Sequence, residues 1–250
     1  EGAVYRQEGR LEIVPETTRQ RLMRFAAGGT VGVPTGLEPG SEDLRTERDA
    51  DALVPVIRFM GPTTLSGVRM DGPVVIQCTD TLTLDADLVV RHCLVQAPYI
   101  RIRSGFAGDV QCFATRGIEV EQDVQLHYPS LLAVVRDVHR DEGAFIEVGG
   151  GSMIQGAMVI LDDGVRGHAG ASMRIASEAL VEGEVLVEGS IQHLGVIRGM
   201  LRANELLLRT SASVYRGYLL DGILEPWPEA KGWAFGLSGE GTRRKLIDRS

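Results

Sequence analysis

Long apolar runs are missing from this chain of 250 residues. No stretch approaches the roughly 20 consecutive apolar residues that a membrane-spanning helix requires, so we predict no membrane span. The first residues, among them Arg6 and Glu8, are charged and do not form a signal peptide. Because the chain starts at Glu1 and not at a methionine, the sequence leaves room for an upstream export signal or anchor.

Basic charge is also scarce. The chain carries 26 Lys and Arg residues against 34 Asp and Glu residues, which gives a formal net charge of −8. Its only basic cluster consists of Arg243, Arg244 and Lys245. Because binding to nucleic acid requires a basic face that neutralises phosphates, we predict no nucleic-acid partner.

The chain has three cysteines, Cys78, Cys93 and Cys112, and none of them forms a C-x-x-C pair. An odd number fits a disulfide framework poorly, so we expect buried free thiols. Together with His92 and His127, the cysteines recur about one structural repeat apart, a spacing that would allow a zinc site. Buried cysteines beside surface histidines are the simpler interpretation, and we predict neither a metal nor another cofactor.

An internal repeat is the strongest signal that is present. Three apolar-x-apolar triplets follow one another at intervals of 18 residues: Leu82-Thr83-Leu84, Ile100-Arg101-Ile102 and Ile118-Glu119-Val120. Alternation of this kind places every second side chain on one face of a strand. From residue 60 to 225 no convincing amphipathic helix interrupts the pattern. We therefore predict an all-β fold, a single-stranded parallel β-helix (β-solenoid) whose repeats stack; a β-sandwich is the main alternative.

The ends of the chain leave the repeat. We expect an irregular N-terminal segment over residues 1–60 that serves as a cap and linker, then the solenoid over 61–225 and a C-terminal cap and tail over 226–250. Within the N-terminal segment we expect a short helix that begins at Thr17 or Thr18 and carries Leu22, Met23 and Phe25.

One loop carries residues typical of catalysis. Asp162, Asp163 and His168 resemble the Asp pair and Gly-His motif of pectin-degrading β-helix hydrolases, in which those motifs lie on separate repeats. Here they share one loop, and the Asn-Thr-Asp and Arg-Ile-Lys segments of that family are missing. The single Asn204 also excludes the asparagine ladders of secreted lyases. Hydrolysis by paired acids requires two positioned carboxyls, so a surface turn is the favoured interpretation.

Residues 180–224 repeat an apolar-x-Gly-x-apolar pattern around Gly183, Gly199 and Gly217, at intervals of 16 and 18 residues. Glycine permits a sharp corner between stacked strands. This stretch is similar to the bactofilins, bacterial polymer-forming β-helix proteins. The resemblance implies the fold, but not filament formation, because aromatic or helical caps would block end-to-end stacking.

The absence of an assembled acid–base or metal set favours a non-catalytic bacterial β-solenoid that acts as a structural scaffold or protein-interaction surface. We expect protein partners or self-association, with residues 136–142 and 162–170 as the contact surface. The bacterial envelope is favoured over the cytoplasm. The alternative is a polysaccharide-active enzyme, a pectin lyase-like hydrolase or lyase, that uses Asp162, Asp163 and His168. A carbohydrate-binding module ranks third, because it usually presents exposed aromatic residues and these make up only 5% of the chain.

Overall fold

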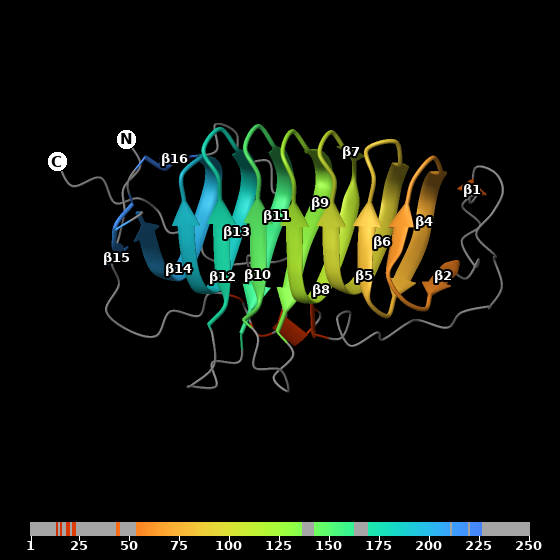
Figure 1. Ribbon diagram of the computed structural model, residues 1–250, viewed down its shortest axis with the longest axis horizontal. Helices are drawn as coiled ribbons and strands as arrows, with labels where there is room; N and C mark the ends of the chain where they lie inside the picture. The colour runs from red at the N-terminus through yellow and green to blue at the C-terminus, as the bar shows by residue number, and fades with distance from the viewer. Residues whose placement is uncertain are drawn as a thin grey trace.

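The computed structural model describes most of the chain between residues 54 and 226 (Figure 1). The described residues are 54–136, 143–162, 170–210, 212–219 and 221–226, together with Leu44, Arg45 and six positions from Val14 to Met23. In Figure 1 the strands follow one another along the long axis of the molecule.

Sixteen strands are assigned in the described part of the chain. In chain order they are β1 (Leu44–Arg45), β2 (Val56–Phe59), β3 (Thr63–Leu65), β4 (Arg69–Cys78), β5 (Thr81–Leu84), β6 (Val89–Ile102), β7 (Ala107–Gly108), β8 (Val110–Val120), β9 (Gln125–Val135), β10 (Phe145–Val148), β11 (Met153–Leu161), β12 (Ser172–Ile175), β13 (Leu180–His193), β14 (Val196–Arg209), β15 (Val214–Arg216) and β16 (Ile223–Glu225).

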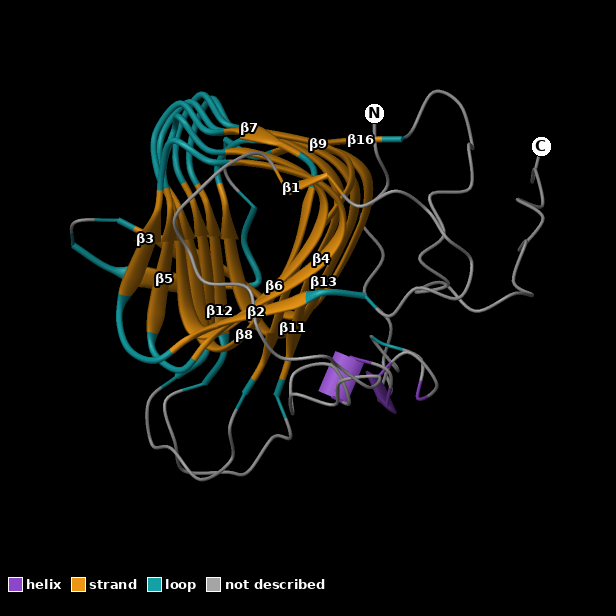
Figure 2. Ribbon diagram, turned by 90° about the vertical axis from the view of Figure 1, so that its right-hand side faces the viewer, coloured by secondary structure: helices purple, strands orange, loops and turns teal. Residues whose placement is uncertain are grey.

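Six of these strands close into a hydrogen-bonded ring of parallel strands. β8 pairs with β10, β10 with β12, and β12 with β13. The ring returns from β13 through β11 and β9 to β8. The other described strands are bonded outside it, β1 to β7 on one side and β14 to β16 on the other. The fold is therefore a closed six-stranded parallel β-barrel, extended by further strands that surround the same interior (Figure 2).

The all-β prediction is confirmed, but the predicted single-stranded parallel β-helix is wrong. The repeat predicted short strands that stack on one another, whereas several strands are long and pass through a corner. β13 pairs with β11 over residues 180–187 and with β12 over residues 190–193. β8 likewise pairs with β9 over residues 111–114 and with β10 over residues 117–120. These bent strands close the ring, and apolar periodicity does not reveal them.

The pairing of the three triplets is confirmed. Leu82 pairs with Ile100, and Ile100 pairs with Ile118. The same column continues to Ile146 and Met173, although residues 137–142 and 163–169, which lie outside the described residues, separate these strands. Parallel pairing in register therefore places equivalent residues of successive strands side by side.

Stacked apolar columns fill the interior. Leu84, Ile102, Val120, Val148 and Ile175 form one such column, and none of their side chains is more than 2% exposed. Full burial of one aliphatic side chain contributes about 1.5–3 kcal/mol. The repeated columns are thus the main source of stability along the barrel.

A second apolar cluster lies on the outer side of the barrel. Phe113, Leu131 and Leu186 belong to it, and Val14 and Leu22 of the N-terminal segment are buried against it. Leu22 and Met23 lie in helical conformation, as expected, and Glu16 is already helical, before the predicted start; Thr17, Thr18 and Phe25 lie outside the described residues. Val14 and Leu22 therefore pack along the side of the barrel, whereas β1 and β2, which also fall within residues 1–60, pair with β4. The segment boundaries at residues 60 and 225 stay predictions.

Glycines form one corner of the barrel. Gly156, Gly183 and Gly199 pair in neighbouring strands and have φ angles of 147°, 144° and 142°. Such angles favour glycine, which has no Cβ. A Cβ on Gly183 would lie 1.8 Å from the carbonyl oxygen of Gly156, so a larger residue requires the backbone to move. The sharp corners predicted at Gly183 and Gly199 are confirmed.

Replacement of Gly183 by alanine is expected to lower the free energy of unfolding by about 3 kcal/mol, through backbone strain and the clash with Gly156. Urea unfolding of the full chain measures this change. Gly170→Ala is the matched control, because nothing lies within 4 Å of its Cβ position. Equal stability of Gly183→Ala and the wild type would contradict the corner geometry.

Candidate functional site

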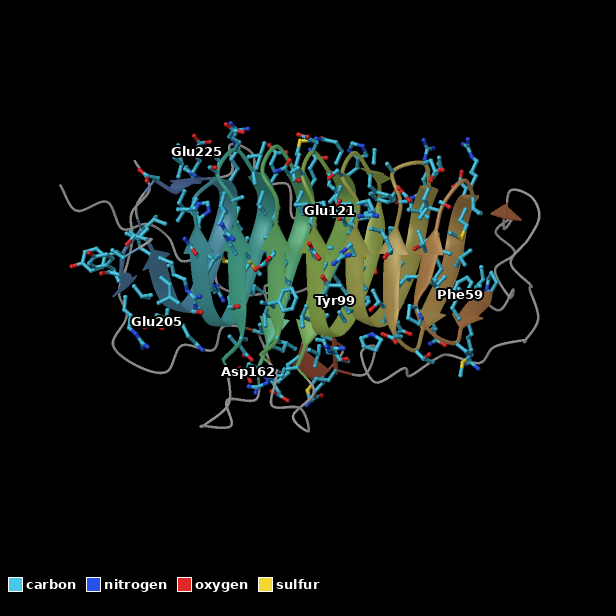
Figure 3. All side chains as sticks on the ribbon, viewed as in Figure 1. Phe59, Tyr99, Glu121, Asp162, Glu205 and Glu225 are labelled. Atoms are coloured by element: carbon cyan, nitrogen blue, oxygen red, sulfur yellow. The ribbon has the colours of Figure 1, made fainter. Side chains whose placement is uncertain are left out.

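An open groove of about 890 Å³ lies on the outer surface of the barrel. It crosses six consecutive paired strands, β6, β8, β10, β12, β13 and β14. Neighbouring strands lie about 4.8 Å apart, so the groove extends for about 24 Å across them. Tyr99 on β6, Glu205 on β14 and Asp162 at the lower edge mark its extent in Figure 3.

Equivalent positions of successive strands build the floor of the groove. Tyr99, Gly117, Phe145, Ser172 and Ser190 are paired in this order. The rings of Tyr99 and Phe145 are 6.0 Å apart and tilted by 52°. The Phe145 ring lies beside Gly117, where a Cβ would approach it to 2.6 Å. The floor therefore changes from aromatic at β6–β10 to hydroxyl-bearing at β12–β13.

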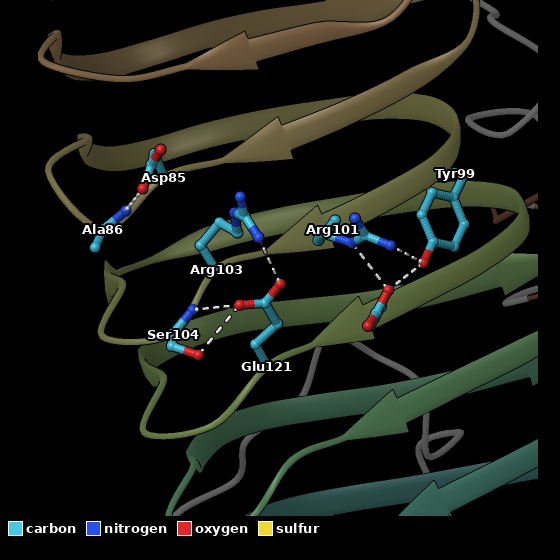
Figure 4. Close-up of polar contacts among 8 residues, drawn as sticks. Asp85, Ala86, Tyr99, Arg101, Arg103, Ser104 and Glu121 are labelled. Carbon is cyan, nitrogen blue, oxygen red and sulfur yellow. Dashed lines mark hydrogen bonds and ion pairs between the residues drawn. The ribbon is translucent and has the colours of Figure 1, made fainter.

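Glu119 is held beside the aromatic part of the groove. The Tyr99 hydroxyl donates a hydrogen bond to its carboxylate, and Nε of Arg101 donates to the same oxygen at 2.9 Å (Figure 4). Burial, and then the hydrogen bond to Glu119, raise the pKa of Tyr99. Hydrogen bonds to Tyr99 and Glu119 raise the pKa of Arg101. The phenol thus stays protonated, the guanidinium stays charged, and both hold the carboxylate in place.

Asp162 belongs to a buried network at the lower edge of the groove. Nη1 of Arg136 lies 3.0 and 3.2 Å from its two carboxylate oxygens, and the backbone N–H of Ala171 donates to one of them at 3.2 Å. The backbone N–H of Asp162 donates to Glu188 at 3.1 Å, and Glu188 also pairs with Arg19. The network joins β11, β13 and the N-terminal segment, so it ties together parts that are distant in the sequence.

Other polar side chains of the groove differ in their contacts. Glu205 pairs with Arg216 at 3.2 Å in an exposed position. Glu147, Ser172 and Asn204 line the groove, and their side chains make no hydrogen bond or ion pair with another described residue. These three groups therefore remain available to a ligand.

Only one of the three predicted catalytic residues lies in the described part of the chain. Asp162 lines the groove, where it pairs with Arg136. Asp163 and His168 lie outside the described residues. The predicted contact surface comprised residues 136–142 and 162–170, of which the structure describes Arg136, Asp162 and Gly170. Asp162 and Gly170 line the groove.

The three cysteines are buried and free of disulfides. Burial raises the pKa of Cys93 to about 12 and also raises the pKa of the Cys112 thiol. Both side chains therefore stay protonated at neutral pH. Within the described ranges, no three His, Cys, Asp or Glu side chains gather into a metal site.

The sequence patterns did not predict most residues of the groove. Tyr99, Phe145, Ser172 and Ser190 each come directly before the first inward residue of a strand segment. Alternation could have assigned them to the outer surface. Their alignment into one floor required the register across residues 137–142 and 163–169, which the sequence does not provide.

The last strands of the described chain leave part of an edge without a partner. β16 pairs with residues 196–198 of β14, and β15 pairs with residues 207–209. No described strand pairs with residues 199–205 on this edge. Leu201 and Ala203, which lie in this stretch, are only partly buried against the core.

Apolar side chains are exposed beside this edge. Val214, Tyr215, Tyr218 and Ile223 are 58%, 47%, 62% and 50% exposed. The rings of Tyr215 and Tyr218 are 6.1 Å apart in an edge-on contact. We name these four residues, with the open edge at residues 199–205, the C-terminal end.

The expectation that Gly217 continues the glycine corner is wrong. β15 runs antiparallel to β14, with Arg216 paired to Leu207. Gly217 follows this hairpin with a φ of 77° and does not pair with Gly199. The sequence interval of 18 residues was kept, but the chain had reversed its direction.

His193 is buried beneath the C-terminal end. Its side chain is 2% exposed, and its Nε2 lies 3.0 Å from the carbonyl oxygen of Ile223 on β16. Nδ1 has no hydrogen-bond partner among the described residues. Burial lowers the pKa of His193, although the hydrogen bond to Ile223 acts in the opposite direction. The neutral ring therefore links β13 to β16.

No helix among the described residues is long and apolar enough to cross a membrane. Comparison of the chain with protein-family models, with curated proteins and with solved structures gave no match. The resemblance of residues 180–224 to bactofilins therefore stays a prediction.

The Arg136–Asp162 pair is expected to be structural. Asp162→Ala leaves Arg136 buried without its partner and should lower the free energy of unfolding by about 3 kcal/mol. Arg136→Met combined with Asp162→Leu should recover a large part of this loss, because neither charge then remains buried. A double-mutant cycle in urea measures the coupling, and a coupling energy near zero would contradict it.

Stability is expected to fall as His193 becomes protonated. Because the folded-state pKa lies below the ordinary 6.5, the unfolded chain takes up the proton more readily. The resulting stability loss is absent well above pH 6.5 and grows as the pH falls from 6.5 toward the folded-state pKa.

Urea unfolding from about pH 7.5 to about pH 5 measures this effect, within the range where histidine titrates. His193→Gln is the control, because it keeps a donor for Ile223 and lacks the titration. The wild type should lose more stability than this variant over that range. Equal losses would show that His193 does not cause the pH dependence.

Proposed function

We propose that the chain is a non-catalytic structural protein whose C-terminal end is a protein-interaction surface. The observation that carries the proposal is the combination of an open strand edge with exposed apolar side chains at one place. The partner to which we commit is a second copy of the chain.

The open edge supports this proposal through its backbone. A strand edge presents unpaired N–H and C=O groups, and these groups pair readily with a strand of another chain. Residues 199–205 of β14 form such an edge among the described strands. Two copies related by a twofold axis would bring two such edges together in antiparallel orientation, which closes the assembly as a dimer.

The exposed side chains supply the apolar surface that such an interface requires. Tyrosine is enriched at interfaces, because its ring buries a large area while its hydroxyl can remain hydrogen-bonded. Tyr215 and Tyr218 lie together, with Val214 and Ile223 also exposed. Val214 and Tyr215 lie on β15 and Ile223 on β16, the two short strands that pair with β14, and Tyr218 follows β15.

A polysaccharide-active enzyme is the second candidate, because an acid-lined groove crosses the barrel. Five described carboxylates line it. Four of them, Glu119, Asp162, Glu188 and Glu205, are engaged by arginines. Hydrolysis of a glycoside generally requires two available carboxyls that face one bond. The engagement of the acids supports the non-catalytic proposal.

Self-association tests the proposal. We expect light scattering of the purified chain to show a concentration-dependent rise in mass from monomer to dimer. Val214→Ser combined with Tyr218→Ser should weaken this association by at least about tenfold, because both side chains lose apolar area that the dimer buries.

Val68→Ser serves as the matched control, since Val68 is 38% exposed near the opposite end of the barrel. It should leave the association unchanged, and circular dichroism should confirm that all variants are folded. A wild type that stays monomeric at several hundred micromolar, or a double variant that still dimerises normally, would refute the proposal.

A further inference from the structure

We infer that the groove on β6–β14 binds an extended oligosaccharide of neutral or amino-substituted sugars. This inference goes beyond the proposed function, because it concerns a groove on the side of the barrel that shares only Asn204 and Glu205 with the open edge. It depends on the side chains that remain available in the groove, on the net charge of the groove, and on the pairing of the strands beneath it.

The charge of the groove is nearly balanced. The four engaged carboxylates are each matched by an arginine, as described above. Glu147 and Arg209 are the lining charges whose side chains pair with no other described residue. A polyanion therefore gains little attraction here. The carboxylate of Glu147 instead favours a hydroxyl donor or a protonated amino group.

The available polar groups match sugar hydroxyls. Glu147 supplies two acceptor oxygens, Ser172 a hydroxyl, and Asn204 both a donor and an acceptor. All three line the groove. Asn204 is the only asparagine in the chain. Because these carboxylate, hydroxyl and amide groups lie on β10, β12 and β14, they can recognise hydroxyls of successive sugar rings.

The aromatic part of the groove supplies the apolar contact. Tyr99 and Phe145 both line it, and their rings lie 6.0 Å apart. The hydrogen bond from Tyr99 to Glu119 and the space over Gly117 hold the two rings in place. A pyranose ring carries an apolar C–H face that packs on such rings. Ligand sites typically combine an apolar surface with a small number of polar groups.

The floor excludes a peptide that would bind as an added strand. β8, β10, β12 and β13 are each paired with strands on both sides, so none of these four strands offers a free backbone edge, and the open edge of β14 lies at one end of the groove. Recognition must therefore come from side chains. Those side chains recur about every 4.8 Å across the strands, which is close to the advance of one pyranose unit in an extended glycan.

Isothermal titration of the full chain with three hexasaccharides tests the inference. The probes are a β-1,4-linked glucose hexamer, a glucosamine hexamer and a galacturonate hexamer. We expect saturable binding of the first two and at least tenfold weaker binding of the third. Asn204→Ala should weaken binding of the glucose hexamer by about fivefold to tenfold, through the lost hydrogen bonds.

Glu147→Gln distinguishes binding of the glucosamine hexamer from binding of the glucose hexamer. It should lower the affinity for the glucosamine hexamer by about tenfold, because the charge-assisted hydrogen bond is lost. The affinity for the glucose hexamer should stay within about twofold of the wild-type value. Asp87→Asn is the matched control, because Asp87 is exposed and lies outside the groove. It should leave all three affinities unchanged.

Three results would overturn the inference. These are no saturable binding of the glucose or glucosamine hexamer at millimolar concentration, preferred binding of the galacturonate hexamer or of an oligolysine, and unchanged affinity in Asn204→Ala. Chromatography of the hexamers after incubation distinguishes this inference from the proposed function. Hexamers of unchanged length are expected. Their shortening would refute the non-catalytic proposal and leave the binding groove in place.

Discussion

The structure depends on parallel backbone pairing in register between successive strands. This pairing places equivalent residues next to one another at a separation of about 4.8 Å, so each position becomes a column that continues across the barrel. Inward columns are apolar along the middle of the barrel, as in the one through Leu82, Ile100 and Ile118. A polar residue there would bury an unpaired group, which is costly. Parallel pairing in register therefore determines both the apolar interior and the order of side chains in the groove.

The same constraint governs charge on the outer surface. Glu119 and Glu147 are paired neighbours of like charge, and Arg101 precedes them in the same column. Like charges directly opposite in a sheet are destabilising. The contacts of Glu119 with Arg101 and Tyr99 offset this repulsion. One carboxylate is thereby engaged while its neighbour is left available, which gives the groove its polarity.

The corner and the C-terminal end show where the pairing changes. At the corner, the carbonyl of each strand approaches the next strand so closely that only glycine fits at Gly183 and Gly199. At the C-terminal end, the reversal of β15 interrupts the parallel series, and β16 resumes it for only three residues. The interior column that contains Ile175 ends there in His193, a polar ring whose hydrogen bond to Ile223 attaches the last strand.

The sequence by itself determined the all-β class, the pairing of the triplets at residues 82, 100 and 118, and the glycine corners at 183 and 199, because each of these depends on local alternation or on a missing Cβ. It could not determine that strands such as β13 bend through a corner and close a ring, since both sides of the bend are equally apolar. Nor could it place Asp162 beside Arg136, or Ser172 beside Phe145, across residues 137–142 and 163–169. Only the tertiary structure decided these neighbours, because register across long insertions is set by the pairing of whole strands and not by spacing in the chain.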